Sequence, residues 1–442
     1  MMAWYLGKSM KIGILIKSSG IEKTTAFLEV IKILIEENAQ VHIVIANRAV
    51  NDREEQFYCD NENVSVEVLN EYEDKSAKIE KVKNLIRKSS ILEAISGTVV
   101  SAIQGLNFER KRKLQGNDAD YAYETFLTKE MREYVVDQSF DCLWVTDEYG
   151  LLWSKWINEH DVQKHKVIYH CLELYWEHYS LQSRKKWRYS REYLLFEEAR
   201  KQLVQAWKII IQDEARWKVL CKYTALDEHR DKIIIPVSIG DYQTYSKNVL
   251  LKRLNISAGK RIIFYPTLLA PKRGCLELVR ITKELPEEYV TVIHGFAAVS
   301  GFVDRLQRKV GEDDNIMISN AAFEYQELID MHQDVWCVFL YYGEADNNDR
   351  YIANSSNKLA MSLQAGKPII TIGNHMLNQL CEEWHCGVVL KGWTTEDMKT
   401  AVTELAENYD VYCKAARKCY EERYDIRKYS EELYKDMYMK EF

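Results

Sequence analysis

A polar loop, a short helix and a buried strand follow one another over residues 343–372, where several side chains are suited to binding an anion. Residues 355–371 read SSNKLAMSLQAGKPIIT. Their apolar side chains keep helical spacing up to Gly366, where a left-handed glycine is expected to end the helix before the apolar run IIT. Backbone N–H groups at a helix start bind anions, so we expect Asn357 and Lys358 to lie at a ligand site.

The elements around this stretch follow the alternation typical of doubly wound parallel sheets. Short apolar runs separated by helical patterns predict strands in the first half at 10–16, 41–46, 64–69, 141–146, 166–170, 208–211 and 232–236. The second half repeats this order at 261–265, 289–294, 315–318, 335–341, 369–372 and 387–390. A helix is predicted over 120–138, and a helical tail from 410 to the end. Because ligands bind beyond the carboxyl ends of such strands, two sheets in series predict a cleft between domains as the active site.

Length and charge limit the possible classes of protein. The chain has 442 residues, of which 47% are hydrophobic and 5 are prolines, which favours two or three compact domains over long disordered linkers. We expect an N-terminal domain over 1–240, a second domain over 241–420, and a C-terminal helix over 421–442 that packs back on the first domain. The formal net charge of -7 argues against a nucleic-acid partner.

The 10 cysteines are scattered, and Cys142, Cys171 and Cys337 lie in apolar runs. This pattern is typical of buried thiols in a reducing compartment, so a cytoplasmic location is expected. Cys381 and Cys386 lie near His385, but no second ligand pair at zinc spacing follows. We therefore expect neither a bound metal nor a cofactor.

No signal peptide or membrane-spanning run is expected in the sequence. The region 81–113 combines helically spaced apolar residues with basic clusters at 81–88 and 110–113. Two interpretations remain open for it: surface helices with solvated charged faces, or a patch that contacts the anionic inner face of a membrane.

The order of motifs resembles the retaining glycosyltransferases of the GT-B fold, in particular those similar to glycosyltransferase family 4. A strand and loop lead to Lys272-Arg273-Gly274 and a helix, and the next strand ends at Gly295. NAAFEYQELIDMHQDVWCVFL and AGKPII follow in the family's order, and the first half carries EEARKQLVQAWKIIIQDEARWKVL and IIIPVSIGD where that family leaves its N-terminal domain. The resemblance implies two Rossmann-like domains that face a central cleft.

In that family, a basic residue before the glycine of the first loop of the C-terminal domain contacts the donor diphosphate. The resemblance places Arg273 in this role, with Lys272 and Gly274 beside it, and a guanidinium suits a departing diphosphate. The chain departs from the family at Thr267, where a second arginine is usual.

The family also carries two glutamates near the donor sugar and ribose, where this sequence has Ala353 and Met361. Glu344, Asp346 or Asp349 are candidates to supply a carboxylate from the loop instead.

The resemblance also places residues of the first domain near the acceptor. His170 and Glu173 stand at a strand end, where a histidine can bind a sugar hydroxyl or transfer a proton. Gly20, in the first loop, would let the backbone approach the diphosphate or acceptor. For His170 and Gly20 a purely structural role, as a satisfied strand-end residue and a simple turn, remains an equal alternative.

Two further positions come from the same resemblance. Tyr325 lies where the family contacts the nucleobase, flanked by Glu324 and Glu327, which are also typical of an exposed helix start. His294 precedes Gly295 at a strand end and is either a donor-site residue or a packing residue.

The function implied by the resemblance is metal-independent transfer of a sugar, with retention, from a nucleotide-sugar to a carbohydrate, lipid-linked or protein acceptor, as in bacterial polysaccharide biosynthesis. The alternatives are a catalytically silent GT-B protein that binds a sugar or nucleotide as the partner of another transferase, and a GT-B sugar epimerase. Fold alone does not decide among them.

Overall fold

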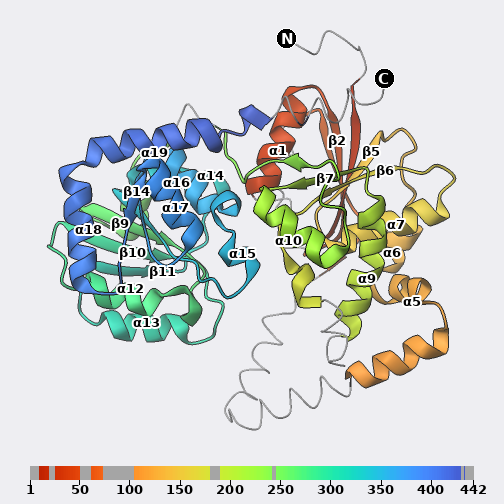
Figure 1. The fold of residues 1–442 in the computed structure, drawn as a ribbon, viewed down its shortest axis with the longest axis horizontal. Coiled ribbons are helices and arrows are strands. Elements are labelled where there is room, and N and C mark those ends of the chain that lie inside the picture. Colours follow the sequence, from red (N-terminus) through yellow and green to blue (C-terminus); the bar gives the residue numbers. More distant parts are fainter. Residues whose placement is uncertain are drawn as a thin grey trace. The chain divides into compact units, whose positions relative to one another are not determined.

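The computed structural model describes residues 9–18, 25–49, 61–72, 104–179, 190–240, 245–429 and 433. The chain divides into two compact units, Met1–Ile234 with Glu432–Phe442, and Ile235–Glu431. Each unit is built on a parallel sheet that is flanked by helices (Figure 1). The predicted α/β class, with one doubly wound sheet in each half of the chain, is confirmed.

The sheet of the first unit has the strand order β3-β2-β1-β5-β6-β7-β8, with β4 paired to β2. The strands are β1 (Lys11–Ser18), β2 (Gln40–Ala49), β3 (Val64–Val68), β4 (Glu71–Tyr72), β5 (Cys142–Val145), β6 (Lys166–His170), β7 (Lys208–Ile211) and β8 (Ile233–Ile234). All pairs are parallel, and β5 and β7 are buried along their whole length, as expected for strands covered on both faces. The direction of strand order reverses between β1 and β5, which makes this the topological switch point of the sheet.

Polar residues at helix starts explain where several helices of this unit begin. The helices are α1 (Thr25–Glu36), α5 (Asp118–Phe126), α6 (Lys129–Glu133), α7 (Glu148–His160), α9 (Ser190–Gln205), α10 (Glu214–Thr224) and the 3-10 turn η2 (Tyr175–Tyr179). Asn117, Asp147 and Asp213 accept backbone hydrogen bonds as N-caps. The single helix predicted over 120–138 is wrong, because Leu127 is extended and Thr128 caps the new helix α6.

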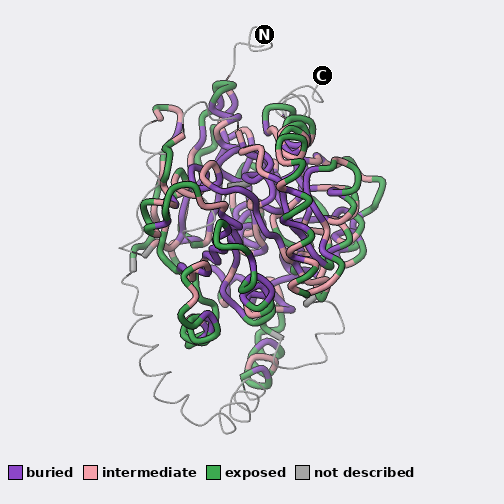
Figure 2. The backbone as a smooth tube through the Cα atoms, turned by 90° about the vertical axis from the view of Figure 1, so that its left-hand side faces the viewer, coloured by how far each residue is buried: buried purple, intermediate pink, exposed green. Residues whose placement is uncertain are grey.

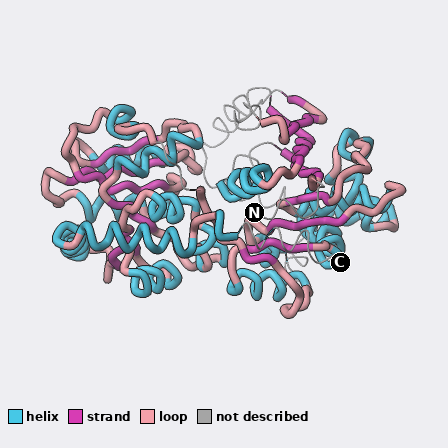
Figure 3. The backbone as a smooth tube through the Cα atoms, turned by 90° about the horizontal axis from the view of Figure 1, so that it is seen from above, coloured by secondary structure: helices cyan, strands magenta, loops and turns pink. Residues whose placement is uncertain are grey.

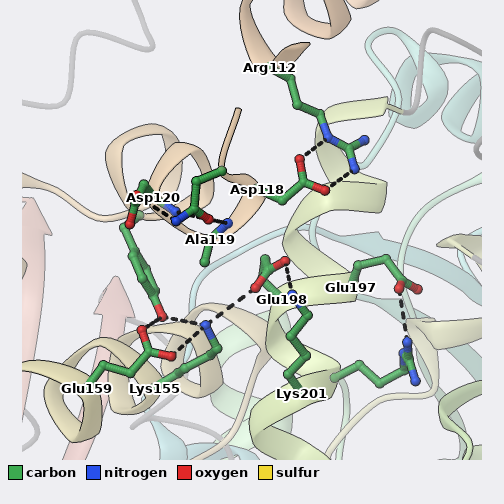
Figure 4. Close-up of polar contacts among 12 residues, drawn as sticks. Arg112, Asp118, Ala119, Asp120, Lys155, Glu159, Glu197, Glu198 and Lys201 are labelled. Carbon is green, nitrogen blue, oxygen red and sulfur yellow. Dashed lines mark hydrogen bonds and ion pairs between the residues drawn. The ribbon is translucent and has the colours of Figure 1, made fainter. Parts of the chain in front are cut away.

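A buried ionic network joins α5, α7 and α9 (Figure 4). The Lys155 ammonium on α7 contacts the Tyr123 hydroxyl at 2.5 Å and carboxylates of Glu159 and Glu198 at 3.0 and 3.4 Å. The Glu198 side chain is only 2% exposed and binds Lys201 at 2.6 Å. Because a buried carboxylate needs cationic partners, this network fixes the packing of the three helices beside the sheet.

The sheet of the second unit has the order β11-β10-β9-β12-β13-β14, and all its pairs are parallel. Its strands are β9 (Arg261–Pro266), β10 (Tyr289–His294), β11 (Ile316–Ser319), β12 (Cys337–Leu340), β13 (Ile369–Thr371) and β14 (Gly387–Val389). The order reverses between β9 and β12, so the switch point of this unit lies between these two strands.

Helices cover both faces of the second sheet, and within each unit the strands run between helices (Figure 3). Buried residues gather in the interior and exposed residues at the surface (Figure 2). The helices of this unit are α11 (Val249–Leu254), η4 (Pro271–Arg273), α12 (Cys275–Thr282), α13 (Phe302–Val310), α14 (Tyr325–Asp334), α15 (Asn347–Arg350), η5 (Ala353–Ser355), α16 (Asn357–Gln364), α17 (His375–Trp384), α18 (Thr395–Glu407) and α19 (Tyr409–Arg423). Helix α16 ends as predicted, with Gly366 at φ +63°. Within the described part of the chain, no helix combines the length and apolar character needed to cross a membrane.

Candidate functional site

The switch point of the second sheet brings together a cation and a carboxylate from loops 76 positions apart in the sequence. Arg273 follows β9 and Asp349 follows β12, and Nη1 of the arginine lies 2.9 Å from Oδ1 of the aspartate. Burial disfavours the charge on Arg273, but Asp349 outweighs it and raises the pKa of the guanidinium. Arg273 therefore stays charged at the position where ligands bind in sheets of this kind.

The loop after β9 is shaped so that Arg273 reaches this position. The Tyr265 hydroxyl donates to the Arg273 carbonyl at 2.5 Å. Gly274 then starts α12 with φ +65°, and a Cβ at this position would lie 2.7 Å from the Trp393 ring. Glycine is therefore needed both for the left-handed conformation and for the close approach. Lys272 lies beside Arg273 but is exposed.

The carboxylates of the β12 loop have separate partners. Asp346 caps α15, while the Asp349 carbonyl accepts a hydrogen bond of 2.8 Å from Asn374. Glu344 accepts from the backbone N–H of His375 at 2.8 Å, and its Oε1 lies 2.6 Å from Nδ1 of the same residue. The backbone N–H of His375 is the main reason that the pKa of Glu344 is lowered. Glu344 and Asp349 thus lie at the carboxyl edge, each held by a partner from another loop.

The start of α16 is connected to Arg273 through one tyrosine. Arg273 lies 5.5 Å from the centre of the Tyr342 ring, and the Tyr342 hydroxyl lies 3.0 Å from Oγ of Ser356. Ser356 caps α16 by accepting from Leu359 N–H at 3.2 Å. Asn357 and Lys358 occupy the first turn of α16 and are partly exposed, so the first-turn backbone and the Lys358 ammonium can reach a ligand.

Ala353 and Met361 contribute to the core of the second unit, where they are 2% and 4% exposed. Both side chains are apolar, so neither offers an oxygen to a donor sugar or ribose. Glu344 and Asp349 are carboxylates at the nearby carboxyl edge that sequence reasoning left among several candidates.

The β10 loop forms the next part of this edge. A Cβ on Gly295 would lie 1.7 Å from the Thr267 carbonyl oxygen, so only glycine permits the loops after β9 and β10 to meet. His294 stacks on Phe264 and is 4.7 Å from the Phe323 ring centre, and its Nδ1 lies 3.1 Å from Oγ of Ser319. Burial lowers the pKa of His294 to about 4, so this histidine is a neutral packing residue at neutral pH.

Tyr325 opens α14, whose start is closed by a capping box between Glu324 and Glu327. The Glu327 carboxylate also binds Arg253 at 2.5 Å. These two glutamates therefore stabilise the helix start. Tyr325 is half-buried and packs against the core of this unit.

The switch point of the first sheet also has a cation and an acid that influence each other electrostatically. Lys17 directly follows the buried part of β1, and its ammonium lies 3.1 Å from the centre of the Tyr149 ring. Burial lowers the pKa of Lys17 to about 8, although the negative charge of Asp147 opposes this shift. Burial also raises the pKa of Asp147, which caps α7 at 2.6 Å from Gly150 N–H. A cation and an acid thus lie near each other at the switch point between β1 and β5.

Glu148, His170 and Glu173 lie at the same edge. Burial, with the charges of Asp147 and Glu173 adding to it, raises the pKa of Glu148 to about 8, so its carboxyl group is largely protonated at neutral pH. His170 is 2% exposed, and its Nδ1 lacks a hydrogen-bond partner among the described residues. Burial lowers the pKa of His170 to about 4. This edge therefore offers a neutral imidazole and a neutral acid, which can accept and donate protons respectively.

The loop that carries Glu173 is held by the neighbouring strand and helix. Gln212 donates to the Cys171 carbonyl at 2.6 Å, and Arg216 donates to the Leu172 carbonyl at 3.1 Å. Arg216 is itself fixed by a 2.6 Å bond to Gln212. Glu173 is exposed on this supported loop. Gly20, the remaining predicted residue of the first unit, lies outside the described residues.

The predicted cysteine pair lies close together, but its histidine does not join it. Cys386 interacts with the thiols of Cys381 and Cys419, and all three cysteines are buried. His385 is exposed and ends α17 in the left-handed conformation. No group of three His, Cys, Asp or Glu side chains in the described ranges has an arrangement that could hold a metal ion.

Sequence reasoning did not single out Lys17, Asp147 and Glu148, and left Asp349 as one of three loop carboxylates. Each follows a predicted strand, so the rule that ligands bind at carboxyl ends could have found them. That rule is weak without the strand order, because every strand has a carboxyl end. Only at the switch point do the chain connections from two neighbouring strands leave in opposite directions, and that point is known only from the strand order.

A scan of protein-family models finds no match for this chain, and neither does a search of curated protein sequences. Solved structures do match. The chain is similar to HepE from Anabaena in complex with UDP and glucose, at 12% identity and a TM-score of 0.60, over 96% of this chain and 98% of the other.

Two further solved structures match with similar identity, coverage and TM-score. Sucrose-phosphate synthase from Thermosynechococcus elongatus has 10% identity and a TM-score of 0.60, with 97% of this chain and 99% of the other covered. WaaG, a glycosyltransferase involved in lipopolysaccharide biosynthesis, has 13% identity and a TM-score of 0.57, with 97% and 99% covered. Together with the two doubly wound sheets, these matches show that the chain has the GT-B fold.

Proposed function

We propose that this protein is a glycosyltransferase that moves a sugar from a nucleotide-sugar donor to a carbohydrate, lipid-linked or protein acceptor. The observation that carries the proposal is the charged Arg273 at the switch point of the second sheet, within a GT-B fold. UDP is the first nucleotide to test, because HepE is described in complexes with UDP and with UDP-glucose.

In this proposal the second unit binds the donor. The diphosphate lies against Arg273, with Gly274 allowing close approach, Lys272 adding charge from the same loop, and the first turn of α16 supplying N–H groups beside Asn357 and Lys358. Negative charge grows on the diphosphate as the glycosidic bond breaks, so fixed positive groups stabilise the transition state without a metal. Tyr325 is the proposed contact to the nucleobase.

The first unit supplies the acceptor groups. His170 is neutral and partly unpaired, which suits a hydrogen bond to a sugar hydroxyl, while Glu173 is exposed beside it. Retention of the anomeric configuration is proposed from the motifs that resemble retaining GT-B enzymes. Gly20 is included because a glycine in the first loop would let the backbone approach the diphosphate or acceptor closely.

Calorimetric titration with UDP, GDP and ADP tests the donor site. We expect micromolar binding of one of them, weakened roughly tenfold or more in Arg273→Ala, because a charge-assisted bidentate contact to phosphate is lost. Arg305→Ala is the matched control, since Arg305 is exposed on α13 of the same unit. A folded protein that binds none of the three nucleotides would contradict the proposal.

Turnover separates transfer from mere binding. Release of UDP from UDP-glucose, followed over a panel of sugar acceptors, is expected to depend on both Arg273 and His170. Tight nucleotide binding without any release or transfer would instead indicate a catalytically silent binding protein.

A peripheral membrane contact is proposed for the helical stretch 104–115, drawn in orange in Figure 1. Leu106 and Leu114 are 43% and 78% exposed on it, beside exposed Arg110, Lys111 and Lys113. Arg112 is buried and bound to Asp118 at 2.6 Å, so it belongs to the fold. Residues 81–103 of the predicted patch lie outside the described residues.

Two exposed leucines that flank a run of basic residues suit the surface of an anionic membrane at its inner face. We expect Leu106→Ser/Leu114→Ser to reduce co-sedimentation with phosphatidylserine vesicles. The control is Val135→Ser/Val162→Ser, which removes two apolar side chains elsewhere in the first unit that are more exposed than either leucine. The contact would be contradicted if both double variants lost co-sedimentation equally, or if the parent protein showed no salt-sensitive co-sedimentation.

A further inference from the structure

The first unit contains a cavity of about 670 Å³ at the amino-terminal edge of its sheet, opposite the edge that carries His170. The cavity is lined by the starts of β1, β2 and β6 and by the turn before β5. From Lys11 to Lys17, β1 spans roughly 20 Å, so this cavity is separate from the switch point of the same sheet. Its volume falls in the range of small-molecule sites.

Most of the lining residues are polar, and they carry more positive than negative charge. Lys11, Lys164 and Lys166 face it together with Asp141, and serine and glutamine side chains complete the polar wall. The Asp141 carboxylate already accepts from the Lys11 backbone N–H at 2.9 Å. This local positive charge stands out because the whole chain has a formal net charge of -7.

The ammonium groups of the three lysines have different surroundings, and that of Lys164 is available to bind a ligand. The Lys11 ammonium donates to Oγ of Ser139 at 3.2 Å, and the Lys166 ammonium lies 4.8 Å from the centre of the Trp207 ring. Lys164 is exposed and forms neither a hydrogen bond nor an ion pair with any residue that the structure describes. Two positioned cations and one free cation thus surround the same space.

A buried histidine on the lining gives an independent indication of a ligand. The His165 side chain is 0% exposed, and its backbone is fixed by two hydrogen bonds to Asn158, of 2.8 and 3.0 Å. Nδ1 has no hydrogen-bond partner within the described ranges, and Nε2 lies 3.6 Å from Asp161. Because buried polar atoms are normally hydrogen-bonded, this imidazole can take a polar group bound beside it as a hydrogen-bond partner.

Stabilisation of helix ends does not account for the lysines. Basic side chains favour the last turn of a helix, because the helix dipole is negative there. Helix α1 has no basic residue in its last turn, and α7 has only His160. The lysines instead belong to the strand starts and to the loop before β6.

We propose that this cavity binds a small phosphorylated ligand of the size of a sugar phosphate. The ammonium groups of Lys11, Lys164 and Lys166 bind the phosphate oxygens, and the hydroxyl and carboxamide groups of the wall bind neutral hydroxyls. Phe140 lines the same cavity and offers an apolar surface to a sugar ring. The phosphate belongs either to a soluble sugar phosphate or to the headgroup of a lipid.

Calorimetry on the full chain with glucose 1-phosphate as the probe tests the soluble form, with glucose as the neutral comparison. We expect binding of the phosphate form only, weakened roughly tenfold in Lys11→Gln/Lys164→Gln. The matched control, Lys129→Gln/Lys222→Gln, removes two exposed charges from helices of the same unit and is expected to bind normally. Arg273→Ala is expected to bind normally too, which separates this site from the donor site.

Vesicles of phosphatidylcholine with and without phosphatidic acid test the lipid form, in a Leu106→Ser/Leu114→Ser background that removes the other proposed membrane contact. Sedimentation that requires phosphatidic acid and is lost in Lys11→Gln/Lys164→Gln supports a headgroup ligand. The proposal is overturned if neither probe binds, if the cavity and control lysine variants weaken binding equally, or if all glucose 1-phosphate binding disappears in Arg273→Ala. Binding that Lys11→Arg/Lys164→Arg retains confirms the need for positive charge.

Discussion

Arg273 and Asp349 form an ion pair of 2.9 Å across the point where β9 and β12 diverge. The Arg273 guanidinium is thereby held in one place before any donor arrives, at the expense of a negative charge next to the proposed diphosphate. Asp349 thus orients the Arg273 guanidinium but also repels the diphosphate that Arg273 is proposed to bind. The balance between these effects can be measured.

Asp349→Asn is expected to tighten UDP binding. An asparagine oxygen can still accept from Arg273, so orientation is kept while the repulsion of a carboxylate is removed. Asp349 is buried, but the proposed diphosphate would lie in an open loop region, so we expect a gain of about 1 kcal/mol, roughly fivefold in affinity by calorimetry. Asp304→Asn makes the same charge change on an exposed part of α13 and should leave affinity unchanged. Weaker binding in Asp349→Asn would show that orientation requires the full charge.

Glu148 is expected to make the protein less stable as the pH rises. Its folded-state pKa of about 8 lies above the usual value near 4.5, so the folded chain holds a proton that the unfolded chain has released. The stabilisation is complete below about pH 4.5 and is lost progressively up to about pH 8.

The comparison with Glu148→Gln isolates this effect, because glutamine has the same shape and does not titrate. Between about pH 5 and about pH 8, the free energy of unfolding of the parent should fall by roughly 3 kcal/mol relative to that of Glu148→Gln, measured by urea denaturation. Glu133→Gln, on the exposed face of α6, should follow the parent curve. Parallel curves for the parent and Glu148→Gln would contradict a raised pKa.

His170→Gln is expected to slow transfer without weakening donor binding. The imidazole is neutral at neutral pH and belongs to the first unit, whereas the proposed nucleotide contacts belong to the second. Loss of a group that binds or deprotonates the acceptor should lower kcat roughly a hundredfold. Turnover and UDP affinity are measured on the same preparation, with His160→Gln on α7 as an exposed histidine control. An unchanged kcat would assign His170 to packing alone.

Gly274→Ala is expected to destabilise the second unit more than Gly301→Ala does. Both glycines start a helix with a left-handed backbone, at φ +65° and +72°. A Cβ at Gly274 would meet Trp393 at 2.7 Å, whereas a Cβ at Gly301 would meet no atom within 4 Å. Both variants carry the same backbone strain. The extra loss of free energy of unfolding in Gly274→Ala should therefore measure the clash with Trp393, about 1–3 kcal/mol. Equal losses in the two variants would mean that the Trp393 ring moves aside at little cost.

The sequence alone predicted the class of fold because buried parallel strands leave a strong signal. Near-continuous apolar runs such as 10–16 and 335–341 are needed only where both faces of a strand are covered. The ends of helices leave a weaker signal in the sequence than the strands do. The division between α5 and α6 depends on Thr128 accepting a backbone hydrogen bond, which a helical spacing of apolar residues does not reveal.

The sequence by itself determined the strands, the glycines of the tight loops and the position of Arg273 just before a helix. Only the tertiary structure decided which strands are neighbours, and therefore that Arg273 meets Asp349 and that Lys17 lies near Asp147. It also decided the protonation of Glu148 and His170, since desolvation depends on every residue packed around a group. Strand order and burial are properties of long-range packing, so no local pattern of residues records them.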